Sequence, residues 1–270
     1  MRHLLSIGVL LAALALQPPA ASADDIEVDV QLFLAVDVSR SMTPRELEIQ
    51  RRGYAEALVS EPVVKAIANG LLGQIAMTYV EWAGSNSQRV VVDWTVVRGR
   101  DDVEAFASQL TAEFDSALRR TSISGALNYA TRSIANNGFT SYRKIIDVSG
   151  DGPNNHGSPV VPARDNALAQ GITINGLPLM TREGMGSQFY LADLDEYYRN
   201  CVIGGPRSFV IPVTEWETFP EAVRRKLVLE LAGTPAPLHR VAARGALAAN
   251  YDCMIGEKIW RRFQGDFFNP

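Results

Sequence analysis

The chain has 270 residues, of which 47% are hydrophobic and 21% charged, and its net charge at pH 7 is −4. That length suits one α/β domain of the larger kind with a buried sheet. The mild acidity argues against a nucleic acid or an anionic membrane surface as partner, because both require a basic face.

The first residues are typical of an export signal. Arg2 and His3 form a short basic start, Leu4–Leu16 is an apolar run, and Ala21–Ala23 offers the small residues that signal peptidase needs. The run is about a dozen residues, whereas a membrane-spanning helix needs about 20. A retained membrane anchor is the alternative interpretation. We expect cleavage after residue 23, so that the mature chain begins at Asp24.

The mature chain is expected to be soluble, in the periplasm or the extracellular medium. Removing 23 residues from 270 leaves 247, with 25 basic and 30 acidic side chains and a net charge of −5. No later run is apolar enough to span a membrane.

The first mature element is predicted to be a buried strand. Val30–Val36 is apolar almost without alternation, as in a central strand covered on both faces, and it ends at Asp37. A helix is expected next, because Thr43 can cap it, Pro44 suits its first position and Glu46 completes a capping box.

The middle of the chain predicts a hairpin and two helices. Gln74–Trp82 and Arg89–Val97 have the composition of strands, and the short loop between them makes the pair antiparallel. Helices are expected over residues 101–113 and 122–137, the second with an apolar stripe at helical spacing.

Strands and helices continue to alternate in the second half. Strands are expected at 143–149, 172–179 and 208–213, and helices at 159–170, at 194–201 and along the stripe Phe219, Val223, Leu227 and Leu231. The whole pattern predicts a single Rossmann-like, doubly wound α/β sheet of about six strands. Its strands are mostly parallel with one antiparallel edge strand, and helices cover both faces.

The pattern weakens after Gly233, so we divide the chain into a signal peptide (1–23), a domain (24–233) and a C-terminal tail (234–270). The tail includes a candidate helix over Val241–Asn250. Cys201 and Cys253 are the only cysteines, and in an oxidising compartment such a pair usually forms a disulfide. The bridge would tie the tail to the domain and contribute about 4 kcal/mol in the loop-entropy model. Two free buried thiols are the alternative.

Oxygen-bearing side chains follow the first strand at alternating positions, namely Asp37, Ser39 and Ser41. In an open α/β sheet, ligands bind beyond the carboxyl ends of the strands. Carboxylate and hydroxyl oxygens suit Mg²⁺, which keeps some of its waters. Helix capping alone is the alternative explanation of this loop. Thr121, before a later helix, and Asp151, after a later strand, are expected at the same sheet edge.

These five residues resemble the metal-ion-dependent adhesion site of the von Willebrand factor type A domain. The resemblance to that domain covers about Val30 to Gly233. In that family, D-x-S-x-S follows the first strand, a Thr precedes a later helix, and an Asp follows the fourth strand. The resemblance implies that Ser39, Ser41 and Thr121 bind Mg²⁺ or Mn²⁺ directly, that Asp37 and Asp151 act directly or through water, and that a partner's carboxylate takes the open position.

Gly150 departs from the family pattern, which often has Thr there, so a supporting hydroxyl is missing. The whole pattern includes the export signal, Ile203-Gly204-Gly205-Pro206 and the helix with Lys226 and Leu227. In this it is also similar to an uncharacterised bacterial family of secreted A-domain proteins, which has no established activity.

Four further residues are weaker candidates. Trp82, Arg119 and Arg120 are candidates for the rim that a partner contacts, although core packing of Trp82 and solvation of the arginines are the simpler interpretations. Asp147 lies in a strand expected to be buried, so it is either a paired structural carboxylate or a support of the site.

The sequence therefore predicts an exported, metal-dependent protein-binding module of the adhesion type. The alternative is a structural envelope or assembly protein in which the metal only stabilises the fold. A hydrolase is less favoured, because no G-x-S-x-G, P-loop, H-E-x-x-H or G-x-G-x-x-G motif occurs and Ser39 stands where a D-x-D phosphatase needs Asp.

Overall fold

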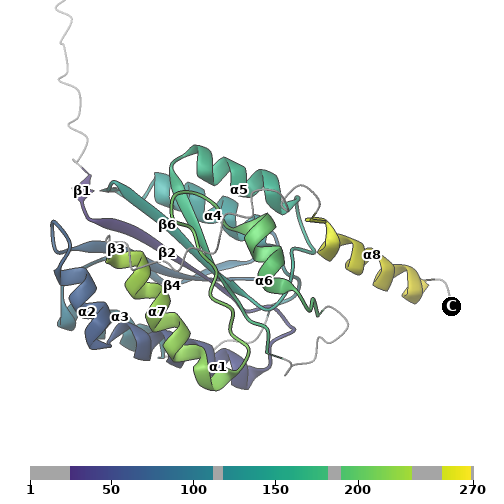
Figure 1. Cartoon of the computed structure of the whole chain (residues 1–270), viewed down its shortest axis with the longest axis horizontal. Helices are drawn as coiled ribbons and strands as arrows, with labels where there is room; N and C mark the ends of the chain where they lie inside the picture. The colour runs from purple at the N-terminus through teal and green to yellow at the C-terminus, as the bar shows by residue number, and fades with distance from the viewer. Residues whose placement is uncertain (1–24, 112–117, 182–189, 233–250, 269–270) are drawn as a thin grey trace, which may run out of the picture.

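The protein, described by a computed structural model over residues 25–111, 118–181, 190–232 and 251–268, is built on a five-stranded sheet (Figure 1). The strand order is β4-β3-β2-β6-β7. Its strands are β2 (Val30–Asp37), β3 (Ile75–Trp82), β4 (Gln88–Val97), β6 (Arg143–Gly150) and β7 (Ile172–Pro178). The short strands β1 (Ile26–Glu27) and β5 (Phe139–Thr140) pair with each other beside it.

The strand β2 lies at the centre of the sheet, as its unbroken apolar pattern predicts. All eight of its residues are buried, and it pairs in parallel with β3 and β6. Only β4 is antiparallel, because a tight turn joins it to β3, with Ala83 N–H donating to Ser87 O and Ser87 N–H to Gly84 O. The predicted α/β class, with a mostly parallel sheet and one antiparallel edge strand, is confirmed.

Helices cover both faces of the sheet (Figure 1). One layer packs on a core shared with β2 and β3 and consists of α1 (Pro44–Leu58), α2 (Glu61–Ala68), α3 (Arg100–Leu110) and α7 (Phe219–Leu231). The other layer consists of α4 (Ile123–Ala135), α5 (Val160–Ala169) and α6 (Leu194–Tyr197), which runs into a π-helical turn, Tyr198–Val202. A 3₁₀ turn, Trp216–Thr218, precedes α7.

The predicted helix start after β2 is confirmed. The Thr43 side chain accepts a hydrogen bond from Glu46 N–H, and the Glu46 carboxylate accepts one from Thr43 N–H, so both halves of the capping box form. This cap fixes where the chain leaves the edge of the sheet and enters α1.

The sixth strand expected at residues 208–213 is present only as isolated bridges. Val210 pairs with Gly176 and Val213 with Leu179. Ile211 N–H donates to Gly176 O and Val213 N–H donates to Pro178 O, but Pro178 of β7 has no N–H to donate back to Ile211 O, so the ladder is interrupted there.

The segment expected as one helix over residues 194–201 is a short α-helix continued by a π-helical turn. The signal peptide and the candidate helix at 241–250 lie outside the described residues. None of the helices in the described part is both long and apolar enough to cross a membrane.

A buried ion cluster ties α7 to β6. Lys226 on α7 contacts Asp147 on β6 and lies 2.7 Å from Glu230 Oε1, and all three side chains are fully buried. Asn175 of β7 also donates to Glu230, at 2.9 Å. Asp147 is therefore a paired structural carboxylate, which was the simpler of the two predictions for it.

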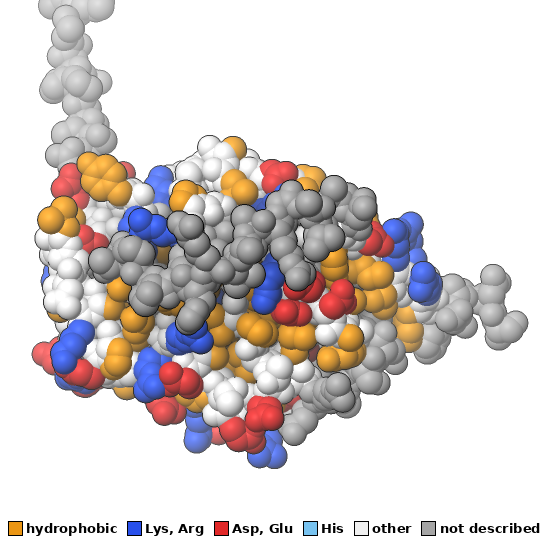
Figure 2. Space-filling view, in the orientation of Figure 1, with side chains coloured by type: hydrophobic (Ala, Val, Ile, Leu, Met, Phe, Trp, Pro, Cys, Tyr) orange, Lys and Arg blue, Asp and Glu red, His pale blue; other side chains and the backbone are white. Residues whose placement is uncertain are grey.

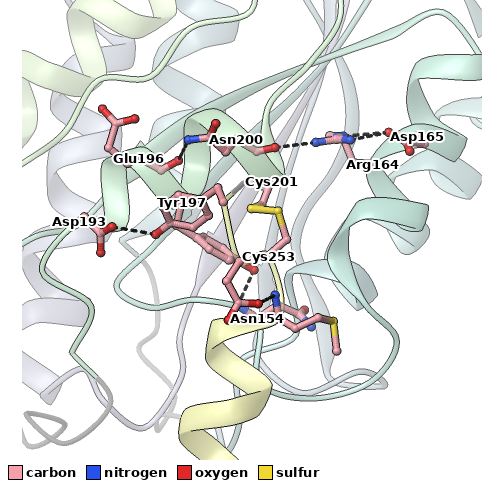
Figure 3. The surroundings of a disulfide bond; sticks show 12 residues. Asn154, Arg164, Asp165, Asp193, Glu196, Tyr197, Asn200, Cys201 and Cys253 are labelled. Carbon is pink, nitrogen blue, oxygen red and sulfur yellow. Dashed lines mark hydrogen bonds and ion pairs between the residues drawn. A yellow bond between two sulfur atoms is a disulfide. The ribbon is translucent and has the colours of Figure 1, made fainter. Parts of the chain in front are cut away.

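A disulfide joins Cys201, at the end of the π-helical turn, to Cys253, just before α8 (Ile255–Phe268). This is the pairing that the sequence predicts. Figure 3 shows the bridge beside Tyr197 and Asn154, where the Asn154 N–H donates to the Tyr197 hydroxyl at 3.1 Å. The bridge therefore fixes the start of α8 against the π-helical turn, beside the loop that follows β6.

Candidate metal centre

Four of the five predicted site residues form one chain of hydrogen bonds at the carboxyl end of β2. Asp37 Oδ1 accepts from Ser39 N–H at 2.7 Å, the hydroxyls of Ser39 and Ser41 lie 2.9 Å apart, and Ser41 donates to Asp151 Oδ1 at 2.8 Å. The side-chain oxygens of two loops, 114 residues apart at Asp37 and Asp151, therefore meet at one place.

Backbone contacts bring Thr121 to the same edge. Leu118 N–H donates to Val38 O at 2.8 Å, which lays this segment beside the loop after β2. Thr121 N–H donates to Asn155 Oδ1 at 3.0 Å, and Asn155 N–H donates to Thr121 O at 2.9 Å. The Thr121 segment is thus held between the loop that carries Ser39 and the loop that follows Asp151.

The site contains a buried acceptor that lacks a donor. Asp37 Oδ2 is fully buried and has no hydrogen-bond partner within the described part of the chain. Burial, and after it the negative charge of Asp151, raises the pKa of Asp37 well above its usual range. A cation at this place would satisfy the oxygen and lower the cost of ionising the carboxyl.

The pKa of Asp151 is raised as well. Burial raises its pKa to about 6, with the negative charge of Glu46 adding to the rise and the Ser41 hydrogen bond opposing it. Glu46 is itself buried, and its Oε1 accepts from Trp216 Nε1 at 3.1 Å. Three carboxyl groups therefore lie at this sheet edge, an arrangement that favours a bound cation.

The donor set fits a hard divalent cation. It offers three hydroxyls, from Ser39, Ser41 and Thr121, and two carboxyls, from Asp37 and Asp151. Oxygen donors with few full charges suit Mg²⁺ or Mn²⁺, which retain water ligands, better than they suit a metal that prefers sulfur or imidazole.

Gly150 is required by the way this site is packed. A Cβ there would lie 2.9 Å from Asp37 Oδ2 and 2.9 Å from the Tyr198 hydroxyl, which is closer than such atoms approach in proteins. Those two oxygens are therefore at most about twice that distance apart. The Tyr198 hydroxyl, from the π-helical turn, therefore leaves no room for a Thr side chain at position 150.

The three rim candidates lie in different environments. Trp82 is 1% exposed and packs in the core under the helical layer that includes α4, which is the simpler of the two interpretations given above, so it is not a rim residue. Arg119 is exposed. Arg120 has a positive φ of 77° and stacks over the Trp260 ring of α8 at 3.9 Å.

Sequence reasoning missed Asn154 and Asn155, which hold the site together. Asn154 Oδ1 accepts from Ser124 N–H at 3.0 Å, and its Nδ2 donates to Glu257 of α8 at 2.7 Å. Asn155 positions Thr121. The signal available was their place directly after Gly150-Asp151-Gly152-Pro153, although only the fold gives their partners.

The sequence matches the model of a family described as "Protein of unknown function (DUF1194)" over residues 27–235. The chain belongs to this family. No curated protein is similar enough to the sequence to count as a relative.

Solved structures with a similar fold include proximal thread matrix protein 1 from the mussel byssus, at 13% identity and a TM-score of 0.55 over 78% of this chain and 49% of that one. In a second structure of that protein the metal-ion-dependent adhesion site is occupied by zinc. It is 15% identical to this chain, with a TM-score of 0.52 over 78% of this chain and 49% of that one.

The pilus adhesin SpaC of Lactobacillus rhamnosus GG gives 13% identity and a TM-score of 0.52 over 76% of this chain and 31% of its own. The chain thus spans half or less of the length of these structures. They confirm the von Willebrand factor A-like fold that the resemblance implies.

Proposed function

We propose that this protein is an exported binding module that holds one divalent cation and uses it to bind a carboxylate of a partner protein. The convergence of Asp37, Ser39, Ser41 and Asp151 in one hydrogen-bonded set supports the proposal. The buried Asp37 Oδ2, which has no hydrogen-bond partner in the described part of the chain, supports it most directly, because it marks where a cation would satisfy the site.

Ser39, Ser41 and Thr121 would hold Mg²⁺ or Mn²⁺ through their hydroxyls, and Asp37 and Asp151 directly or through water. A hard cation with an open coordination position supplies an attraction for a carboxylate oxygen from outside. The chain's own residues align the hydroxyls and keep the two carboxyls close. One of the similar structures carries zinc at its metal-ion-dependent adhesion site, and another is a pilus adhesin. Both favour a role in adhesion or assembly.

Asp37→Ala should abolish Mn²⁺ binding measured by calorimetry, with a native circular dichroism spectrum, because it removes both Oδ1, which anchors the loop through Ser39 N–H, and Oδ2, which the cation would satisfy. Ser124→Ala is the matched control, since this buried hydroxyl lies at the start of α4 outside the proposed set, and it should leave the affinity within about twofold. Mn²⁺ uptake by Asp37→Ala equal to that of the parent protein would refute the metal centre.

A pull-down from envelope extract, with Mg²⁺ against chelator, separates binding from a purely stabilising role. The proposed function predicts that chelation removes both the captured partner and part of the thermal stability. Loss of stability alone would favour a structural envelope protein in which the metal only stabilises the fold.

A further inference from the structure

A pocket of about 440 Å³ opens at the same sheet edge, beyond β7. Its walls include Met180, the aromatic rings of Tyr190 and Trp216, and the two carboxylates of Glu215 and Glu217, together with small and hydroxyl side chains. Nothing in the proposed metal centre uses these residues.

The pocket shares a wall with the candidate metal centre. Trp216 Nε1 donates to Glu46 Oε1 at 3.1 Å, and Glu46 belongs to the capping box of α1, directly after the loop that carries Ser39 and Ser41. On the other side, Met180 follows Leu179, whose N–H donates to Gly150 O at 2.9 Å. The pocket therefore lies one hydrogen bond from the start of α1 on one side and next to the residue paired with Gly150 on the other.

Positive and negative side chains lie on opposite sides of the metal centre at this end of the sheet. Arg40 and Arg119, both exposed, lie in the loops on the β2 and β3 side of the centre. Glu215 and Glu217 are the only charged side chains among the described residues that line the pocket, on the β7 side. Carboxylates beside aromatic rings attract a cationic group by ion pairing and cation–π contact.

We infer that the pocket binds a lysine or arginine side chain of the same partner whose carboxylate reaches the metal. The part about a shared partner rests on the proposed function, whereas the affinity for a basic side chain does not. A partner with only a carboxylate meets repulsion from Glu46, Glu215 and Glu217, and an adjoining basic residue removes it.

The spacing of the strands limits the ligand. Asp151 follows β6 and Met180 follows β7, and neighbouring strands lie roughly 4.8 Å apart. An extended peptide advances about 3.3 Å per residue. One strand spacing therefore corresponds to about one and a half residues, and the length of a basic side chain extends that reach, so the basic residue lies within about four positions of the acidic one in the partner's sequence.

Titration of the protein with Nα-acetyl-arginine amide tests the pocket without any metal. The indole N–H signal of Trp216 is followed by NMR in the presence of chelator, and uncharged Nα-acetyl-citrulline amide is the matched probe. The arginine probe should bind at least fivefold more tightly than the citrulline probe. Glu215→Gln/Glu217→Gln should remove that preference, and Glu56→Gln/Glu104→Gln, which changes the net charge equally on α1 and α3, should keep it.

Equal affinity for the two probes, or an unchanged preference in Glu215→Gln/Glu217→Gln, would overturn the inference. The same titration of Asp37→Ala, in which the metal centre is lost, still measures binding of the arginine probe to the pocket. Failure of the proposed function can therefore be distinguished from failure of the inference about the pocket.

A second titration tests the shared ligand. In Mg²⁺, acetyl-Asp-Gly-Gly-Arg-amide should bind at least fivefold more tightly than acetyl-Ala-Gly-Gly-Arg-amide, and chelator should abolish the difference. If the two peptides bind equally in Mg²⁺ while the arginine probe still prefers the pocket, the two sites do not serve one ligand, and that half of the inference is overturned.

Discussion

Gly150 and Tyr198 act as a pair beside Asp37, although they come from β6 and from the π-helical turn. Without a Cβ at position 150, the Tyr198 hydroxyl comes close to the buried Asp37 Oδ2 and lies 3.5 Å from Gly150 O. The A-domain pattern often has a Thr hydroxyl at position 150. Here a tyrosine hydroxyl from another element lies 2.9 Å from the place that a Cβ at position 150 would take, and it donates to Gly150 O rather than to Asp37 Oδ2.

Tyr198→Phe should weaken Mn²⁺ binding about tenfold, because groups that support metal ligands typically contribute that much to affinity. Calorimetry measures the affinity, and thermal unfolding with chelator shows whether the fold is kept. Gly150→Thr should unfold at lower temperature than the parent protein, since its Cβ meets two oxygens at 2.9 Å. In Gly150→Thr/Tyr198→Phe one of those contacts is gone, so part of the stability should return. Parental Mn²⁺ affinity in Tyr198→Phe would contradict a supporting role.

Among the elements, α7 is attached to the sheet by one buried cation and two buried carboxyls. Lys226 contacts Asp147 and Glu230, so with both carboxyls ionised this cluster carries a net charge of −1 in the core. Burial raises the pKa of Glu230 to about 7, the negative charge of Asp147 adds to the rise, and Lys226 opposes it. The attachment of α7 therefore depends on pH.

The sign of this dependence follows from the raised pKa. The folded protein holds the Glu230 proton more tightly than the unfolded chain does. The contribution of this proton to the free energy of unfolding is therefore complete below about pH 4.5 and is lost as the pH rises to about 7. Glu230→Gln keeps an uncharged side chain at every pH. With chelator present, the difference in unfolding free energy between Glu230→Gln and the parent should shift in favour of the variant by up to about 3 kcal/mol between pH 4.5 and 8. Denaturant unfolding at several pH values measures it, and a pH-independent difference would refute the assignment.

Elements with strong local signals were predictable, and those set by tertiary contacts were not. The unbroken apolar run of β2 and the capping box at Thr43 and Glu46 identify their elements without any partner. The π-helical turn has no sequence period of its own. The stripe of Ile255, Ile259 and Phe263 in α8 has helical spacing, so this helix was predictable although it is not among the helices predicted above, whereas the candidate helix at 241–250 lies outside the described residues.

The same distinction applies to the candidate site. Asp37, Ser39, Ser41 and Asp151 were predictable as neighbours because parallel strands bring their carboxyl ends to one edge. The contacts of Asn154 with α8 and of Tyr198 with Gly150 join segments far apart in sequence, so no local pattern reports them.

In the whole molecule, the tail returns to the end of the sheet that carries the candidate site. Figure 1 shows α8 leaving the body at the end opposite the first strand, and Figure 2 shows hydrophobic side chains gathered where it leaves. Gly256 packs on Asn154, Glu257 accepts a hydrogen bond from Asn154, and Trp260 stacks on Arg120. Because Asn155 and Arg120 flank Thr121, the position of α8 is coupled to that of a proposed metal ligand.

Opening the disulfide should therefore act on both stability and metal binding. Cys201→Ala/Cys253→Ala removes a cross-link between residues 52 positions apart, which costs about 4 kcal/mol in the loop-entropy model. It also frees the start of α8, so Mn²⁺ affinity should fall several-fold as Asn154 and Arg120 lose their fixed partners. Denaturant unfolding and calorimetry measure the two effects. Trp260→Ala is the matched control, since it removes the Arg120 contact with the disulfide intact and should weaken Mn²⁺ binding with a smaller loss of stability. If Cys201→Ala/Cys253→Ala were less stable but bound Mn²⁺ with parental affinity, α8 would not position Thr121.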